Sequence, residues 1–340
     1  FLSRDRFGEK PIYYFHSGDK FIFASEIKAI LNHDIKKELN KPAISSFLSY
    51  RYILGEETLF KGIFKLLPSH NLIYNLREKK IEKIWEYWDL QENKRYFTEI
   101  EAKKELDNQL NYSIKTRKIS DVPLGVILSG GLDSSLVTAI SAGQEQEPIN
   151  TFTVKFSEEG FDETEFAKTV ATLNKTNHFE VPVDSTNFLD IMKEYSKYKD
   201  EPVGVPNEIA LYLLAKKIKE NVTVILSGEG ADEIFEGYGR IFSSVRDYAL
   251  LQKIKNDFSK HPNLSKKYIS NLDSELKHFL FLYNYWTEVE KNFILNENSK
   301  KDYSEIIADY FYKFDVPYSK KISYVFLKLH LPGLLNRLDS

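Results

Sequence analysis

One short segment constrains the fold of this chain more than any other. Leu124-Gly-Val-Ile-Leu128 is a continuous apolar run, which is typical of a strand buried on both faces. It leads directly into Ser129-Gly-Gly-Leu-Asp-Ser-Ser135, and helical spacing follows from Ser134 to Ala142. A strand, a glycine turn and a helix in this order predict that the chain bends sharply at residues 130–131. The backbone there can approach a ligand closely because glycine has no side chain.

The residue types in this segment are those that bind phosphate groups. A helix start offers unpaired N–H groups and the positive end of the helix dipole, an interaction worth about 0.3–2 kcal/mol, so several such contacts must combine. Ser129, Ser134 and Ser135 add hydroxyl donors. Asp133 would repel a phosphate unless a Mg²⁺ ion lies between them. No lysine follows the glycines as it does in a Walker loop, which argues against a P-loop kinase or GTPase.

The alternative is a plain strand–turn–helix connection in which Asp133 and Ser134 only cap the helix. We favour the ligand-binding interpretation, because five fixed residues in this order arise by chance in only about 1 in 1,000 chains of this length.

A second segment repeats the pattern. An apolar run at residues 222–226 leads into Ser227-Gly-Glu-Gly-Ala-Asp-Glu233. Ligands bind at the carboxyl ends of strands in open parallel sheets, so we expect both segments to face one cleft. The alternative for Glu229, Asp232 and Glu233 is an acidic helix start stabilised by the dipole. That alternative explains Glu233 well and explains Glu229, between two glycines, poorly.

Between and around these segments, apolar strand patterns alternate with helical ones. Strands are predicted at 151–156, 178–183 and 222–226, and helices at 100–117, 163–174, 187–198 and 207–219. This alternation predicts an α/β fold with a parallel sheet covered on both faces. Residues 241–330 have mostly helical patterns and carry no motif that we can interpret.

Residues 1–90 follow a different pattern of short strands. We predict hairpins from strands at 12–15 and 20–23 and from strands at 71–74 and 81–88, with a short helix at 25–31. These elements indicate an antiparallel or α+β layer. The polar stretch Gln91–Arg95 is the predicted linker. A length of 340 residues fits about two domains.

Composition excludes several classes of protein and site. The 47 Lys and Arg against 50 Asp and Glu leave no excess of positive charge for nucleic acid or an anionic membrane. No apolar run approaches the roughly 18 residues of a membrane span. Cysteine is absent, which excludes disulfides, thiolate zinc sites and a cysteine nucleophile within these residues and suits a reducing cytoplasm. The only methionine is Met192, so we expect a piece of a longer protein.

These motifs resemble those of the glutamine-hydrolysing asparagine synthetase family. Residues 120–135 resemble its pyrophosphate loop, and residues 226–233 resemble its second signature. Residues 4–14 and 23–29 resemble the later half of its glutaminase domain. Residues 332–340 resemble the segment that precedes its C-terminal helices.

The resemblance implies an architecture and a reaction. Residues 1–90 would be the C-terminal part of an α+β Ntn-hydrolase amidotransferase domain, and residues 95–340 a parallel-sheet ATP-pyrophosphatase (PP-loop) domain truncated at its C-terminus. In that family, ATP and aspartate give β-aspartyl-AMP and pyrophosphate, and ammonia from glutamine then displaces AMP. The implied partners are therefore the small molecules aspartate, ATP, and glutamine or ammonia, with no nucleic acid and no membrane. A homodimer is compatible with the resemblance, but the sequence does not determine the oligomeric state.

The resemblance also implies roles for individual residues. Glu229 would act where the adenylate forms, as an electrostatic or proton-transfer group. Asp133 and Asp232 would hold Mg²⁺. The expected ATP-binding residues are Leu128, Ser129, Gly130, Gly131, Asp133, Ser134, Val154, Ser227 and Gly228.

Other residues are ambiguous or depart from the family pattern. Asp162-Glu163 resembles an acidic pair of the family but is explained equally well as a helix cap, and His178 is expected to be structural. The family's usual Pro-Gly-His is here Pro68-Ser69-His70. The family's catalytic cysteine would precede Phe1, and a lysine that stabilises its adenylation transition state would follow Ser340.

Two other functions stay open at this point. The first is a related amidotransferase that acts on a sugar or peptide carboxylate, or a β-lactam-forming relative. The second, of another class, is a nucleotide-binding module without turnover. The segment Glu201–Glu208 is expected to border the acceptor pocket, but no substrate can be deduced from it.

Overall fold

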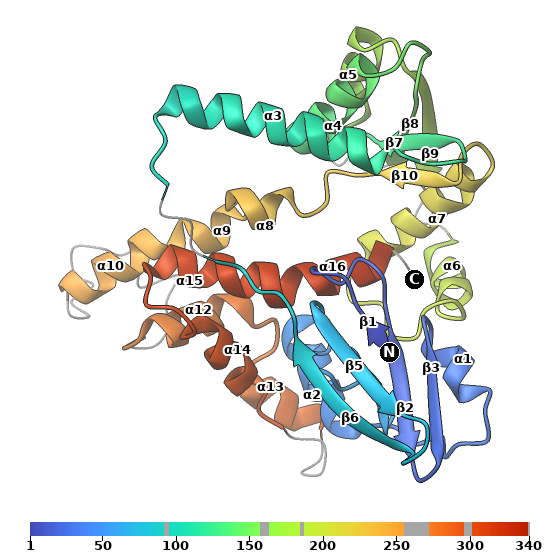
Figure 1. Ribbon diagram of the computed structural model, residues 1–340. Helices are drawn as coiled ribbons and strands as arrows, with labels where there is room; N and C mark the ends of the chain where they lie inside the picture. The colour runs from blue at the N-terminus through green and yellow to red at the C-terminus, as the bar shows by residue number, and fades with distance from the viewer. Residues whose placement is uncertain (92–94, 157–162, 184–186, 255–271, 296–300, 339–340) are drawn as a thin grey trace. The chain divides into compact units, whose positions relative to one another are not determined.

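The computed structural model describes residues 1–91, 95–156, 163–183, 187–254, 272–295 and 301–338. The chain forms two compact units (Figure 1). Unit 1 comprises residues 1–90, 200–204 and 230–340, and unit 2 comprises residues 91–199 and 205–229. The predicted linker Gln91–Arg95 lies partly outside the described residues.

Unit 2 contains a four-stranded parallel sheet in the order β10-β7-β8-β9. The predicted α/β fold with a parallel sheet is therefore confirmed, and the element ends differ from the predictions by a few residues. The strands are β7 (Leu124–Ile127), β8 (Asn150–Phe156), β9 (Asn177–Val183) and β10 (Val224–Leu226). The helices are α3 (Glu99–Arg117), α4 (Leu132–Gly143), α5 (Thr164–Leu173), α6 (Phe188–Tyr195) and α7 (Asn207–Lys219).

Burial along β8 shows that both faces of this sheet are covered. Thr151, Phe152 and Thr153 are all buried although successive side chains point to opposite faces. Phe152 packs with Leu214 and Ile218 of α7. The helix α5 packs through Ala167 and Ala171 against Leu128, just after β7. A strand that is buried on both faces explains the continuous apolar run from which the sheet was predicted.

Unit 1 contains two three-stranded antiparallel sheets, in the orders β3-β2-β4 and β1-β5-β6. The predicted hairpins are confirmed as β2–β3, which turns at Gly18 with a positive φ of 58°, and β5–β6. The strands are β1 (Leu2–Ser3), β2 (Tyr13–Ser17), β3 (Lys20–Ala24), β4 (Ile63–Lys65), β5 (His70–Asn75) and β6 (Lys80–Glu86). Helix α1 (Ile27–Leu31) follows β3, and α2 (Lys41–Tyr50) was not predicted.

The helical part of unit 1 has an aromatic core. Phe279, Tyr283, Phe311 and Phe326 are buried in one cluster, which Tyr52 joins from the N-terminal part of the chain. The helices are α8 (Ala231–Phe235), α9 (Gly239–Phe242), α10 (Ser244–Ile254), α12 (Glu275–Tyr283), α13 (Glu288–Ile294), α14 (Ser304–Phe311), α15 (Tyr318–Val325), the π-helical turn η4 (Phe326–His330) and α16 (Leu331–Leu338). None of the helices in the described part of the chain combines the length and the apolar character needed to cross a bilayer.

Candidate functional site

The first glycine segment forms a tight loop between β7 and α4 in unit 2. The Leu128 N–H donates to the carbonyl of Phe152 on β8 at 2.8 Å, which continues the sheet by one residue. Ser134, on the first turn of α4, folds back over the loop: its Oγ accepts from the Ser129 N–H at 3.1 Å and lies 2.9 Å from the Ser129 Oγ. The loop is therefore held by hydrogen bonds between its own serines.

The capping alternative for this segment is wrong. The N-cap of α4 is Gly131, and no side chain makes the cap hydrogen bond. The Ser134 hydroxyl bonds to Ser129 and to the Gly131 carbonyl at 3.3 Å instead of to the first N–H groups of the helix. Asp133 is half-buried in the first helical turn. A Cβ on Gly131 would meet only the Ser129 Oγ, at 3.4 Å, among the described residues, so the helix start has open space before it.

Gly130 is required by its conformation and by its surroundings. Its φ is +87°, in the region that favours glycine. A Cβ on Gly130 would lie 2.8 Å from the backbone nitrogen of Ala167 and 2.8 Å from the Cβ of Phe166, both on α5. The loop therefore packs closely on the first turn of α5. Nothing local in the sequence indicates this contact, because it joins segments more than 30 residues apart.

The second glycine segment meets the first one within unit 2. β10 lies beside β7 in parallel, with Leu226 opposite Val126, so the two loops leave the same edge of the sheet. A Cβ on Gly228 would lie 3.0 Å from the backbone nitrogen of Ser134 and 3.1 Å from the Cβ of Asp133. The two bends are thus in contact at the start of α4.

The remaining predicted residues are placed as follows. Val154 is half-buried on β8, and Ser227 follows β10, where its Oγ accepts from the Glu229 N–H at 3.3 Å. The Glu229 residue is exposed. Asp232 and Glu233 belong to unit 1, in the first turn of α8, as the helix-start alternative predicts. Glu233 is buried and accepts a hydrogen bond from the Tyr238 hydroxyl at 2.6 Å.

This loop has the features of a phosphate cradle. Gly131 leaves the backbone at the helix start accessible, and the Ser135 Oγ is buried without a hydrogen-bond partner among the described residues. Those residues contain no group of three or more His, Cys, Asp or Glu that could hold a metal ion by itself. A Mg²⁺ ion bound through one or two carboxylates and the phosphates of a nucleotide needs no such group, so Asp133 is compatible with this kind of site.

Two ambiguous residues can now be placed. His178 lies on β9, where its Nδ1 is 3.0 Å from the Thr151 Oγ1 and burial lowers its pKa, as expected of a structural histidine. Glu163 takes the N-cap position of α5 without a side-chain cap hydrogen bond, and Asp162 lies outside the described residues.

The segment expected to border the acceptor pocket, residues 201–208, ends in a buried acid, and another acid, Asp200, comes directly before it. Glu208, on α7, is 1% exposed and forms an ion pair with Lys199, which is 5% exposed. Asp200 belongs to unit 1, where its carboxylate accepts from the N–H groups of Ile27 and Lys28 at 2.5 and 3.1 Å and so caps α1. Burial raises the pKa of Asp200 in spite of these hydrogen bonds.

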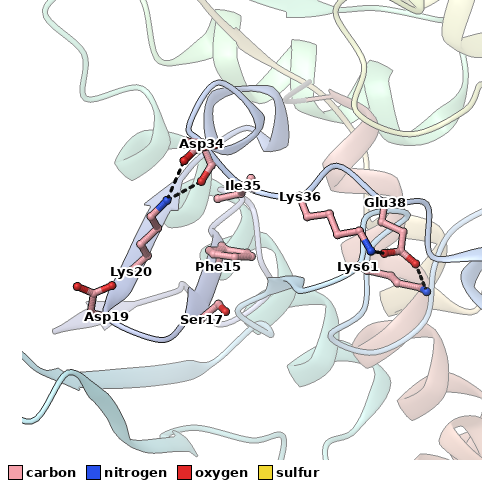
Figure 2. Close-up of a pocket in the computed structure, with 9 residues that line it drawn as sticks. All are labelled: Phe15, Ser17, Asp19, Lys20, Asp34, Ile35, Lys36, Glu38 and Lys61. Carbon is pink, nitrogen blue, oxygen red and sulfur yellow. Dashed lines mark hydrogen bonds and ion pairs between the residues drawn. The ribbon is translucent and has the colours of Figure 1, made fainter.

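A pocket in unit 1 contains none of the predicted site residues. It has a volume of about 420 Å³, and most of its charged side chains pair with one another (Figure 2). Lys36 and Lys61 both bond to Glu38 and lower its pKa to about 2, and Lys20 pairs with Asp34 at 3.5 Å. Its lining is Phe15, Ser17, Asp19, Lys20, Asp34, Ile35, Lys36, Glu38 and Lys61.

Comparison with known protein families assigns both parts of the chain. Residues 105–336 match the profile of the asparagine synthase family, and residues 1–88 match that of a glutamine amidotransferase domain. The chain belongs to the asparagine synthase family. The predicted division into domains at about residues 90–95 stays a prediction.

Relatives in the asparagine synthase family come from archaea, bacteria and fungi. A Methanocaldococcus jannaschii protein, named provisionally as glutamine-hydrolysing asparagine synthetase 2, is 36% identical over 242 residues, which are 70% of this chain and 47% of that protein. Asparagine synthetase 1 of Bacillus subtilis is 32% identical over 69% of this chain and 37% of its own length. Amidase chyE of Penicillium rubens is 28% identical over 69% of this chain and 37% of its own length. The chain thus spans less than half the length of these curated relatives.

Proposed function

We propose that this protein activates aspartate with ATP, as β-aspartyl-AMP and pyrophosphate, and that ammonia then displaces AMP to give asparagine. One observation carries the proposal: Gly228 lies against the Ser134 nitrogen at the start of α4. Two glycine bends at the same edge of a parallel sheet form a surface of backbone N–H groups and hydroxyls, which suits an extended triphosphate.

In this proposal the chain acts by positioning and by electrostatics. A carboxylate oxygen of aspartate attacks the α-phosphorus of ATP, the bond from that phosphorus to the bridging oxygen breaks, and pyrophosphate leaves. The N–H groups at the start of α4 and the hydroxyls of Ser129 and Ser134 would hold the departing pyrophosphate. Leu128, Val154, Ser227 and Gly228 would contact the rest of ATP. Preorganised donors of this kind stabilise charge that develops on a leaving group, so no protein nucleophile is needed.

The remaining roles follow from the family resemblance rather than from the arrangement of the two units. Asp133 and Asp232 would hold Mg²⁺, which when bound would screen the negative charge of the phosphates from the attacking carboxylate. Glu229 would act as an electrostatic or proton-transfer group near the reacting carboxylate.

A related reaction on a different carboxylate is the second candidate. The relative from Penicillium rubens is named as an amidase, and the chain matches it over almost the same share of its length as it matches the B. subtilis synthetase. The same ATP chemistry would then serve another acceptor, because the glycine bends contact the nucleotide and not the acceptor side chain.

Pyrophosphate release tests these candidates directly. The purified protein is supplied with ATP, Mg²⁺ and ammonium, which removes any need for glutamine hydrolysis, and with aspartate or other carboxylates in turn. Release that depends on aspartate supports the first candidate, and release with another acid supports the second. Binding of Mg·ATP by calorimetry without product from any acid would contradict both and would favour a nucleotide-binding module.

A further inference from the structure

Gly237 follows α8 in unit 1, and its backbone conformation does not explain why it is glycine. Helices commonly end with a glycine in the left-handed region. Here Glu236 takes that position, with a φ of 60°, and Gly237 is not among the residues with positive φ. The Gly237 N–H donates to the Asp232 carbonyl at 2.9 Å, a bond that any residue except proline could make.

The space around Gly237 does explain it. A Cβ at this position would lie 1.9 Å from the Oδ1 of Asp232 and 2.9 Å from its Cγ, closer than the 3.0 Å below which real Cβ contacts are essentially never found. The next atom, the Asp232 Cα, would be 3.1 Å away. The clash is therefore mainly with the carboxylate, and Gly237 is otherwise exposed.

The residues on both sides of Gly237 are anchored, so the loop cannot easily move away from Asp232. The Glu236 carboxylate accepts from Lys320 at 2.9 Å and from the Ser323 hydroxyl at 2.8 Å, both on α15. The Tyr238 hydroxyl donates to Glu233 at 2.6 Å. An added side chain at 237 must therefore displace the Asp232 carboxylate.

We infer that Gly237 is a positioning residue: it provides the space for the Asp232 carboxylate and so fixes the orientation of this proposed Mg²⁺ ligand. This inference rests on the proposed function, in which Asp232 holds Mg²⁺. Some residues do not bind a metal ion themselves but orient one of its ligands. Altering such a residue commonly lowers the metal affinity by about 10- to 100-fold.

The chain provides a matched control. A Cβ on Gly239, two residues further on at the start of α9, would meet no atom within 4 Å. Gly239 is also absent from the residues with positive φ. Gly237→Ala and Gly239→Ala therefore add the same methyl group to the same region, and only the first one meets Asp232.

The test uses calorimetry to measure ATP binding at increasing Mg²⁺ concentrations, without aspartate, and yields an apparent Mg²⁺ affinity. We expect Gly237→Ala to weaken the apparent Mg²⁺ affinity about 10- to 100-fold, with an unchanged melting temperature, and Gly239→Ala to match the wild type. Asp232→Ala should weaken it at least as much, and the double variant Asp232→Ala/Gly237→Ala should be no worse than Asp232→Ala alone, because the two residues act as one unit.

Any of three results would overturn the inference. The first two are wild-type Mg²⁺ affinity in Gly237→Ala and wild-type Mg²⁺ affinity in Asp232→Ala. The third is a loss of Mg²⁺ affinity in the double variant that equals the product of the two single-variant losses. These results are separate from a failure of the proposed function. That failure would appear as wild-type protein that binds Mg·ATP but releases no pyrophosphate with aspartate.

Discussion

Gly228 and Ser134 are in backbone contact: a Cβ on Gly228 would lie only 3.0 Å from the Ser134 nitrogen, although the two residues are more than 90 positions apart. The contact exists because β10 and β7 are parallel neighbours that end at the same level, and each strand is followed directly by a glycine bend. It joins the two motifs into one surface within unit 2.

Gly228→Ala should therefore impair nucleotide use. The methyl group would press on the first turn of α4 and move the N–H groups that are proposed to hold pyrophosphate, and a displacement of about 1 Å can cost about 100-fold in rate. Since a contact of 3.0 Å requires a smaller shift, of a few tenths of an ångström, we expect a measurable loss in pyrophosphate release that does not exceed about 100-fold. The matched control is Gly143→Ala in the same unit, because a Cβ there would meet nothing within 4 Å. Equal rates in the two variants would contradict the proposed role of the contact.

Ser69 is expected to store backbone strain. It is fully buried with a φ of 57°, in the left-handed region that favours glycine. Its Oγ accepts a long hydrogen bond, 3.4 Å, from Lys328. Since both variants lose that bond, we predict that Ser69→Gly is more stable than Ser69→Ala by about 1 kcal/mol, because only glycine relieves the left-handed backbone. Chemical denaturation measures the difference, and the reverse order would show that the strain is not there.

The buried pair of Lys199 and Glu208 should be sensitive to the loss of one partner. Both side chains are at most 5% exposed. Lys199→Met leaves the Glu208 carboxylate buried without this partner, so we expect a loss of about 3–5 kcal/mol in unfolding free energy. Glu208→Leu in the Lys199→Met background should recover part of it, since no buried charge is then left from the pair. A double variant that is less stable than Lys199→Met would contradict this explanation.

His330 should make stability depend on pH. Burial, with a smaller contribution from Arg337, lowers its pKa to about 3, against an ordinary value near 6.5. Between those values the unfolded chain binds one more proton than the folded protein, so stability falls as the pH decreases from about 6.5 toward 3. The contribution of one such group is about 1.4 kcal/mol per pH unit.

Unfolding free energies of the wild type and of His330→Gln, measured between pH 7 and pH 5, test this directly. The variant should have the smaller slope by about one proton. Parallel profiles would mean that His330 is as easily protonated in the folded protein as in the unfolded one.

The sheet and the glycine bends could be predicted because their signals are local. The strands of unit 2 are continuous apolar runs, and each glycine bend is specified by consecutive residues such as Ser129–Ser135. Helix α7 was predicted with its observed ends, Asn207 and Lys219. Gly130 shows the limit of this reasoning: its positive φ follows from the turn, but its contact with Ala167 depends on how α5 packs.

Helix α2 was missed for a physical reason. Three of its five buried residues are Ser45, Ser46 and Ser49, so its core-facing side has no apolar periodicity. The ammonium of Lys291, on α13, donates to Ser45 at 3.1 Å and to Ser49 at 2.8 Å. A buried cation requires such polar partners, and the sequence gives no sign that a lysine about 245 residues away will supply the cation.

Asp133→Ala, assayed for aspartate-dependent pyrophosphate release with ATP, Mg²⁺ and ammonium, tests most directly whether the joined glycine bends activate a carboxylate with ATP. The helix should still form, because Gly131 and not Asp133 is its N-cap. We predict that the wild type releases pyrophosphate only when an acceptor acid such as aspartate is present, and that the variant loses release while its melting temperature is unchanged. Release at the wild-type rate from the variant, or none from the wild type with any acid, would contradict the proposed function.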